Sequence, residues 1–345
     1  LGPVNDAPEG TDNTVTTLED TAYTFAAANF GFTDPLDAPP DVLSQVKITT
    51  LPGAGSILLG GSPVIAGQDV TVADINLGNL TFMPAADGNG VGYTSFTFQV
   101  RDDGGTVDGG VDLDPTANTM TIDVTPVNDV PSFTIAGDQT VLEDAGAQAV
   151  AGWVTMMSAG PANEAGQALD FIVSNNNNLL FSVQPAVSPA GTLTYTPAAN
   201  ANGAATVTVQ IHDDGGTANG GVDTSAALFF QINVTGVNDV PSYTMAGDQT
   251  LLEDAGAQTM IGFASNISAG PPDESSWQVV DFIVSNNNNG LFSVQPAISP
   301  AGDLTFTPAA DANGAATVTV QIHDDGGTAN GGVDTSAAQF FQINV

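Results

Sequence analysis

The sequence predicts an all-β protein of three tandem domains, each a seven-stranded Greek-key β-sandwich, arranged as an elongated rod. The first observation is a repeat: residues 201–227 recur letter for letter at 312–338, 111 residues later, and self-similarity at a fixed period is the signature of a repeat protein. The second is a series of short runs that alternate polar and apolar residues between clusters of Gly, Pro, Asn and Asp. Such runs are typical of sandwich strands.

The strand-like runs occupy matching places in the repeats. Thr206–Ile211 and Leu304–Thr307 alternate with a period of two, and the first third of the chain carries Leu80–Met83 and Tyr93–Val100 in the same style. This alternation places one set of side chains in a core and the other in solvent. No stretch has the periodicity of an amphipathic helix, so we expect two antiparallel sheets in every domain.

The domain boundaries are marked by Val-Asn-Asp followed by one residue and a proline. The motif begins at Val4, Val127 and Val237, which predicts domains at 1–126, 127–236 and 237–345. Because the linkers are very short, neighbouring domains should touch end to end. The end and the start of the chain, placed in series, nearly reproduce an internal linker. We therefore expect either a segment of a longer covalent array or a subunit that stacks head to tail with identical subunits.

The charge of the chain is extreme, with 38 acidic residues against only Lys47 and Arg101. Such a chain repels nucleic acid, because phosphates are neutralised by Lys and Arg. There is no cysteine for a disulfide, and no apolar run is long enough to insert into a membrane. Two explanations of the acidity compete. One is adaptation to a saline habitat, and the other is neutralisation of clustered carboxylates by divalent cations.

The acidic motifs recur beside the predicted boundaries. In a Greek-key sandwich, the loops after the first strand and before the sixth lie near the outgoing linker, and the loop after the sixth lies near the incoming linker. Leu-Glu-Asp follows the first strand and Asp-Asp-Gly-Gly follows the sixth. We therefore expect the first junction to gather Glu19, Asp20, Asp87, Asn128, Asp129, Asp213 and Asp214. We expect the second to gather Glu143, Asp144, Asn238, Asp239, Asp324 and Asp325.

The same motifs occur at the two outer ends of the chain. The corresponding candidates are Asn5, Asp6, Asp102 and Asp103 at the N-terminal end, and Glu253 and Asp254 at the other. Hard oxygen ligands in such number suit Ca²⁺, which takes six to eight of them. Mg²⁺ fits less well because it keeps its waters, and Zn²⁺ prefers Cys and His. The other interpretation is plain turn chemistry, in which Asp bonds the local backbone and Gly takes a positive φ.

These residues resemble the cadherin-like tandem repeats of bacteria, the "VNDAP" repeats of giant surface proteins and RTX-type adhesins. The resemblance covers all three domains and rests on Val4–Pro8, Val127–Pro131 and Val237–Pro241 together with the Leu-Glu-Asp and Asp-Asp-Gly-Gly motifs. It implies extracellular β-sandwich rods on the bacterial cell surface, with calcium at the domain junctions. It also implies Asp34 and Asp37 as ligands, because they belong to an Asp-rich segment that the second and third domains lack.

The sequence thus favours a structural function, as part of an adhesin stalk or surface filament that Ca²⁺ makes rigid. The alternative is a binding module whose loops recognise a glycan or a cell-surface partner, for which two similar domains would supply avidity. An enzyme is not expected, because the carboxylates are explained by the repeats and no Ser/His/Asp set, Cys nucleophile or phosphate loop stands outside them. A terminal strand could also complete the sheet of a neighbouring subunit.

Overall fold

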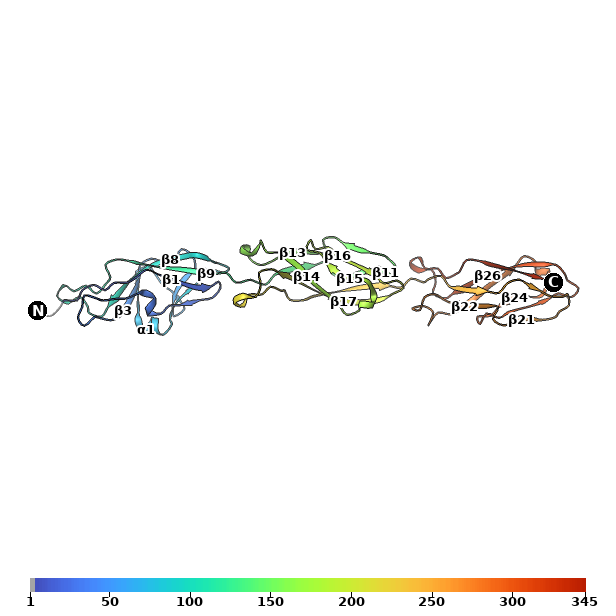
Figure 1. Cartoon of the computed structure of the whole chain (residues 1–345), viewed down its shortest axis with the longest axis horizontal. Helices are drawn as coiled ribbons and strands as arrows, with labels where there is room; N and C mark the ends of the chain where they lie inside the picture. Colours follow the sequence, from blue (N-terminus) through green and yellow to red (C-terminus); the bar gives the residue numbers. More distant parts are fainter. Residues whose placement is uncertain (1–3) are drawn as a thin grey trace. The chain divides into compact units, whose positions relative to one another are not determined.

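The structure is a computed structural model that describes residues 4–345. It divides into two compact units, whose elements are labelled in Figure 1. Unit 1 holds the residues up to Phe133 together with Met156–Asp170 and Ile211–Ser225, and unit 2 holds Thr134–Thr155, Phe171–Gln210 and Ala226–Val345. The first three residues of the first predicted domain lie outside the described range. The predicted boundaries after residues 126 and 236 stay predictions, and we use them below to name the first, second and third repeats.

In unit 1, the first repeat forms two sheets with the strand orders β1-β9-β8-β3-β6 and β2-β7-β4-β5. β1 runs parallel to β9, with Asn13 opposite Met120, and β8 runs antiparallel to β9. The elements are β1 (Asn13–Leu18), β2 (Tyr23–Thr24), η1 (Ala27–Phe30), β3 (Leu43–Ile48), β4 (Ser56–Leu59), β5 (Ser62–Pro63), β6 (Gln68–Thr71), α1 (Val72–Asn76), β7 (Leu80–Met83), β8 (Gly90–Asp102), η2 (Val107–Gly109) and β9 (Asn118–Thr125).

In unit 2, the third repeat has sheets with the orders β20-β27-β26-β23, β21-β25-β24 and β19-β22. The first predicted strand is interrupted into β19 and β20, which pair with different partners, and the second is interrupted into β21 and β22. Seven strands per sandwich are therefore confirmed here. The elements are β19 (Ser242–Met245), β20 (Gln249–Thr250), β21 (Gln258–Met260), β22 (Ala264–Ser268), β23 (Val280–Asn286), η6 (Asn289–Leu291), β24 (Phe292–Ile298), β25 (Leu304–Pro308), β26 (Ala315–Asp324), η7 (Ala329–Gly331) and β27 (Gln339–Asn344).

The second repeat has the same element order as the third and contributes to both units. Within unit 2, β11 runs parallel to β18, and β12 and β15 flank β16. The elements are β10 (Ser132–Ile135), β11 (Gln139–Leu142), β12 (Gln148–Val150), β13 (Val154–Ser158), η3 (Ala162–Glu164), β14 (Leu169–Asn175), η4 (Asn178–Leu180), β15 (Phe181–Val187), β16 (Leu193–Pro197), β17 (Gly203–Asp213), η5 (Ala218–Gly220) and β18 (Leu228–Thr235).

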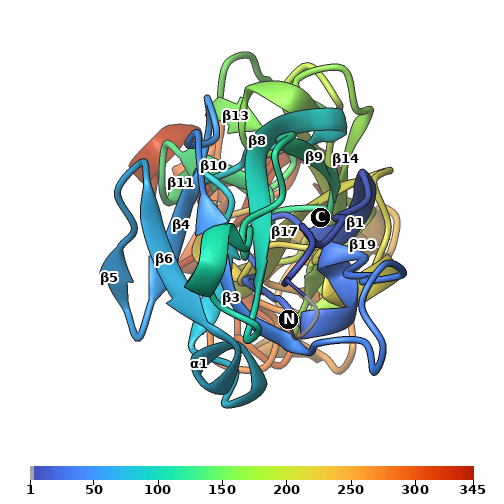
Figure 2. The same ribbon diagram turned by 90° about the vertical axis from the view of Figure 1, so that its left-hand side faces the viewer.

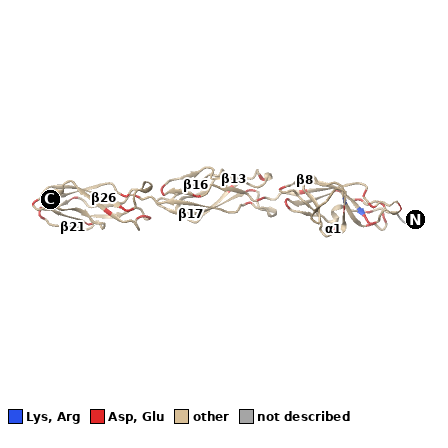
Figure 3. Ribbon diagram, turned by 180° about the vertical axis from the view of Figure 1, so that it is seen from behind, with Lys and Arg blue, Asp and Glu red and all other residues tan. Residues whose placement is uncertain are grey.

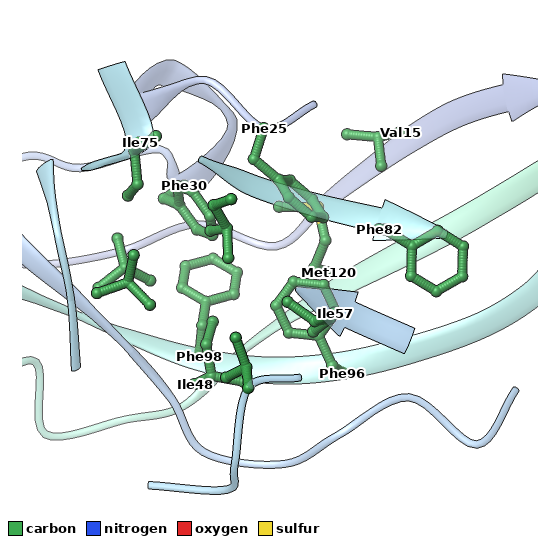
Figure 4. Packing of buried hydrophobic residues seen from close by; sticks show 14 of the residues in the cluster. Val15, Phe25, Phe30, Ile48, Ile57, Ile75, Phe82, Phe96, Phe98 and Met120 are labelled. Atoms are coloured by element: carbon green, nitrogen blue, oxygen red, sulfur yellow. The ribbon is translucent and has the colours of Figure 1, made fainter. Parts of the chain in front are cut away.

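The cores follow the alternation in the sequence. In the first repeat Phe25 packs edge-on against Phe96 with ring centroids 5.7 Å apart, and Phe30 packs against Phe98 at 5.0 Å. Figure 4 shows these rings meeting between the two sheets. Along β26, every second residue is buried. This matches the prediction that one face of each strand is a core face.

The first repeat carries elements that the seven-strand prediction did not include. β5 and β6 are additional strands, and α1 follows β6 directly (Figure 2). The hydroxyl of Thr71 accepts a 3.1 Å hydrogen bond from the backbone of Asp74, which caps the first turn of α1. At five residues α1 is too short to produce a helical period, so the pattern of the sequence could not reveal it.

Acidic residues gather in the loops where strands end, and both cationic residues, Lys47 and Arg101, lie in the first repeat (Figure 3). Arg101 makes an ion pair of 2.7 Å with Asp112. Among residues 4–345, no helix is long and apolar enough to cross a membrane.

Candidate metal centres

Parallel pairing of the first strand with the last places Glu19 beside the outgoing linker. Because β1 runs alongside β9, the backbone N–H of Glu19 donates to the carbonyl of Thr125 over 2.9 Å. The linker begins immediately after that carbonyl. Glu19 Oε1 accepts the backbone N–H of Val127, and its Oε2 accepts the side chain of Asn89 at 2.8 Å. Glu19 is therefore a buried acid, only 4% exposed, at the exit of the first repeat.

The linker residue Asn128 is clamped to the second repeat. Its Nδ2 donates to Asp213 Oδ1 and to the carbonyl of Val222, both at 2.9 Å. Its Oδ1 accepts the side chain of Gln167 at 2.7 Å. A Cβ on Gly215 would lie 1.8 Å from Asn128 Oδ1, so the glycine is needed for this close approach. The clamp fixes the position of the next residue, Asp129.

Asp129 meets two carboxylates from different repeats. Carboxylate oxygens of Glu19, Asp129 and Glu164 all lie within 4.8 Å of one another. Glu164 Oε1 accepts the backbone N–H of Asp129 at 2.9 Å. Glu164 is 5% exposed, and its Oε2 is buried without a hydrogen-bond partner among the described residues, as is Oδ2 of Asp129. A buried oxygen without a donor costs free energy unless another group, such as a cation, satisfies it.

A second acidic group shares Asp129. Oxygens of Asp20, Asp87 and Asp129 also lie within 4.8 Å of one another. Asp20 and Asp87 both have positive φ, 53° and 55°, and Asp20 Oδ1 accepts the backbone N–H of Asp87 at 3.2 Å. The two turns are thus tied together at the end of the first repeat. We call the residues Glu19, Asp20, Asp87, Asp129 and Glu164 the first junction.

The electrostatics of the first junction disfavour its ionised state when no cation is bound. Burial raises the pKa of Asp129, and the carboxylates of Asp87, Glu19 and Asp20 raise it further. Burial also raises the pKa of Glu164, with smaller contributions from Asp129, Glu19 and Asp213 and an opposing one from its hydrogen bond with the backbone of Asp129. A hollow of about 310 Å³ opens beside these residues. Like charges this close are stabilised by a cation between them.

The second junction, in unit 2, repeats the arrangement. Oxygens of Glu143, Asp239 and Glu274 lie within 4.8 Å of one another. Asn238 Nδ2 donates to Asp324 Oδ1 at 2.9 Å, as Asn128 does to Asp213. Burial is the largest cause of a raised pKa at Glu143, Asp239 and Glu274 alike. We call Glu143, Asp144, Asp239, Asp273 and Glu274 the second junction.

The N-terminal end of the first repeat carries a fourth group. Oxygens of Asp34, Asp37 and Asp41 lie within 4.8 Å of one another. Asp34 is 6% exposed; its Oδ2 accepts the backbone N–H of Asp41 at 2.7 Å, and its Oδ1 is buried with no partner in the described part of the chain. Asp37 Oδ2 accepts the N–H of Asp6, and Asn5 Nδ2 donates to buried Asp102.

Several predicted ligands lie outside these groups. Asp103, Asp214 and Asp325 are exposed, and each accepts a backbone N–H at 2.8–2.9 Å, from Val42, Ala168 and Val279 respectively. These second Asp residues of the Asp-Asp-Gly-Gly motif therefore hold loops, as the turn-chemistry interpretation expects. Glu253 and Asp254 are exposed, and Asp254 accepts the N–H of Asp311.

The sequence reasoning missed Glu164 and Glu274. A signal was available, because each follows a repeated Ser-Ala-Gly-Pro, at Ser158–Pro161 and Ser268–Pro271. Each also lies 35 residues after the linker aspartate whose N–H it accepts. These glutamates stand where the first repeat uses its Asp-rich segment, since Asp37 makes the matching bond to Asp6. The later repeats, which lack the Asp-rich segment, thus place a carboxylate in this position from a different segment of the chain.

Chemically, the four groups offer only oxygen, and they could hold a metal ion. Two ligands of one Ca²⁺ at 2.3–2.6 Å lie at most about 5 Å apart, which accommodates the spacing within each group. No hydrogen-bond donor of the described chain reaches the unpartnered buried oxygens, and a hard cation is a suitable partner for them. The Asn runs behave differently: Asn175 bonds Gln184, and Asn177 bonds the carbonyl of Ala204.

No protein-family model and no curated protein matches the chain. Among solved structures it is similar to human CDH23 EC21-23, at 14% identity, 98% coverage of this chain and 100% of that chain, with a TM-score of 0.45. It is similar to mouse protocadherin-24 EC1-3, at 13% identity, 96% coverage of both chains and a TM-score of 0.43. For the human desmocollin-1 ectodomain the values are 14%, 98% of this chain, 61% of that chain and 0.41. The likeness is one of fold, and this chain spans less than two thirds of the desmocollin-1 chain.

Proposed function

We propose that this chain is a structural segment of an extracellular stalk, adhesin or surface filament whose junctions are made rigid by Ca²⁺. The observation that carries the proposal is the buried Oε2 of Glu164, which has no partner among the described residues and lies in a group with Glu19 and Asp129. The three side chains come from the end of one repeat, the linker and the start of the next. A cation bound to all three would tie the repeats together.

The mechanism is electrostatic. Without a cation the carboxylates of a junction repel one another, and the linker is free to bend. With Ca²⁺ bound, the same carboxylates become bridges between consecutive repeats. Extracellular Ca²⁺ modules often bind with dissociation constants of about 10⁻⁴–10⁻³ M, so ordinary extracellular calcium would fill the junctions. The partners of the segment are then further repeats or identical subunits placed head to tail.

Small-angle X-ray scattering of the whole chain, with Ca²⁺ and then with excess EGTA, tests the proposal. We expect a stiff, extended particle with Ca²⁺ and a more flexible one after chelation. Asp129→Asn should weaken the response, because Asp129 belongs to both groups of the first junction. Asp108→Asn is the matched control: Asp108 is exposed, and the second and third repeats carry Asn219 and Asn330 at its place with nearly the same φ.

A scattering profile that EGTA leaves unchanged would overturn the proposal. The acidic surface would then be explained as adaptation to salt, and the linkers would be held by packing alone. A loss of response in Asp108→Asn equal to that in Asp129→Asn would also count against it, because a general effect of net charge would explain both.

A further inference from the structure

The two junctions are not equivalent. The first contains two groups of three carboxylates that share Asp129, whereas the second contains a single group, Glu143, Asp239 and Glu274. The flanking backbone is the same in both. Asp20 Oδ1 accepts the N–H of Asp87 at 3.2 Å, and Asp144 Oδ1 accepts the N–H of Asn200 at 3.2 Å. The difference therefore lies in side-chain chemistry and not in the course of the chain.

The first cause is an Asp-to-Asn difference at a turn that both repeats share. Asp87 and Asn200 have φ of 55° and 53° and occupy the same place in their repeats. Asn200 offers an amide where Asp87 offers a carboxylate, so the second junction lacks a charge on this side. An amide oxygen is a weaker ligand for Ca²⁺ than a charged carboxylate.

The second cause is hydrogen bonding by the protein itself. Glu164 uses only Oε1 to accept the N–H of Asp129, and its Oε2 stays unpartnered and buried within the described residues. Glu274 accepts the N–H of Asp239 with both oxygens, at 3.0 and 3.1 Å. Both oxygens of Glu274 thus share one N–H, whereas Oε2 of Glu164 has no donor among the described residues and stays available to an ion.

The third cause is a charge on the opposite side of the second junction. Asp273 stands where the second repeat has Asn163. Asn202 Nδ2 donates to Asp273 Oδ2 at 3.1 Å, which links the second and third repeats directly without an ion. Asn202 also donates to Glu143 Oε2 of its own repeat at 3.5 Å, as the matching Asn89 does to Glu19 at 2.8 Å, but Asn89 makes no bond to the following repeat within the described residues. Asp273 Oδ1 and Asp239 Oδ2 stay buried without a partner in the described part of the chain, so the second junction keeps oxygens for one ion while Asn202 already joins its two repeats.

Resting on the function proposed above, we propose that the junctions differ in cation capacity. The first binds two Ca²⁺ ions that share Asp129, and the second binds one fewer and more weakly. Each oxygen of a carboxylate can bind a different ion, so Asp129 can bridge two sites. At the turn that both junctions share, the first presents three carboxylates, Asp20, Asp87 and Asp129, where the second presents two and the amide of Asn200. Ligand charge raises Ca²⁺ affinity, so this additional site of the first junction fills at lower calcium. The segment would then become rigid in two steps as calcium rises.

Trp277 provides a native probe of the second junction. It is 65% exposed, lines the hollow there with Glu143 and Glu274, and its indole N–H donates to the carbonyl of Asp273 at 2.6 Å. The other tryptophan, Trp153, packs on Phe230, and the third repeat has Phe263 in its place, packed on Phe341. Trp153→Phe therefore leaves a chain in which fluorescence reports on the second junction alone.

The experiment measures Ca²⁺ stoichiometry by calorimetry and Trp277 emission in this background, for the parent and two reciprocal variants. Asp87→Asn should lose about one ion of high affinity and leave the Trp277 midpoint unmoved. Asn200→Asp should gain about one ion and shift the Trp277 midpoint to about tenfold lower Ca²⁺.

The outcomes separate this inference from the proposed function. The parent could bind Ca²⁺ at both junctions with a single midpoint that neither variant alters. That result would overturn the proposed difference between the junctions and would leave the proposed calcium function unaffected. A parent that binds no Ca²⁺ overturns both. Circular dichroism of each variant in EGTA checks that the repeats are folded. If Asp87→Asn alone is unfolded, the gain expected for Asn200→Asp decides the inference.

Discussion

The backbone N–H of Asp129 donates a hydrogen bond of 2.9 Å to Glu164 Oε1, across 35 residues of the chain. The bond recurs between Asp239 and Glu274 at 3.0 Å and the same separation. It fixes an acidic residue of the linker against an acidic residue of the following repeat. Two carboxylates are thereby held close in the folded chain, which is unfavourable without a cation and favourable with one.

Glu164→Gln should raise the free energy of unfolding without calcium and reduce the stabilisation that calcium provides. In EGTA the free energy of unfolding should rise, because one of three mutually repelling carboxylates becomes neutral. With Ca²⁺ the variant should gain less stability than the parent, because an ion at the first junction loses a charged ligand. Urea unfolding at both conditions measures the two differences.

The control for this prediction is again Asp108→Asn, which removes one negative charge at an exposed residue that belongs to none of the carboxylate groups found within residues 4–345. It should change stability little in either condition. If Glu164→Gln destabilised the chain equally with Ca²⁺ and with EGTA, Glu164 would be a structural acceptor and not a ligand.

Asn128→Ala should destabilise the start of the second repeat. The side chain supplies donors to Asp213, which is fully buried, and to the carbonyl of Val222. Its removal leaves a buried carboxylate short of a donor, which costs about 1–3 kcal/mol. Asn177→Ala removes an exposed bond to Ala204 and should cost clearly less. Equal midpoints of chemical unfolding for the two variants would contradict the clamp.

Much of the fold could be predicted because it follows from local patterns. The alternation in Leu304–Thr307 and in Thr206–Ile211 lies in β25 and β17, with alternate residues buried. The interruption of the first strand into β19 and β20 could not be predicted, because it depends on which sheet each half pairs with. Helix α1 could not be predicted either, because five residues are too few to show a helical period.

Of the candidate site, only the residues that belong to motifs recurring in all three repeats could be predicted to lie close together. Glu19, Asp20, Asp87 and Asp129 could be placed together because strand order fixes the end at which each loop lies. Glu164 could not, because its contact with Asp129 depends on the three-residue turn η3, which no periodicity marks. The role of Asp214 in holding a loop could not be predicted either, because an aspartate that binds a metal and one that stabilises a turn look alike in sequence.

Gly302→Ala should be far more damaging than Gly256→Ala, although both glycines have positive φ, 90° and 70°. A Cβ at Gly302 would lie 2.0 Å from the carbonyl oxygen of Ala264, whereas at Gly256 it would meet nothing within 4 Å. Gly256→Ala should cost about 1 kcal/mol through backbone strain alone. Gly302→Ala should cost about 3 kcal/mol or more, because β22 or its neighbouring turn must move. Thermal unfolding of the two variants compares them directly.

Alkaline unfolding should begin in the third repeat, at Tyr243. Burial raises the pKa of its phenol to about 12, and its hydroxyl donates to the carbonyl of Val320 at 2.8 Å. The phenol of an unfolded chain ionises near pH 10. Below that pH both states are protonated, and the contribution of the buried phenol is fully present. Between about pH 10 and 12 the unfolded state loses its proton first, so stability falls by about 1.4 kcal/mol per pH unit for this group.

Tyr243→Phe is the matched variant, because the second repeat has Phe133 at the same place. It should reduce the loss of stability between about pH 10 and 12, since one phenol no longer titrates. Burial also raises the pKa of Tyr195, so a smaller dependence should persist in the variant. Urea unfolding across this range, with phenolate absorbance followed in parallel, measures both. An unchanged slope in Tyr243→Phe would mean that the phenol of Tyr243 ionises without opposing the fold.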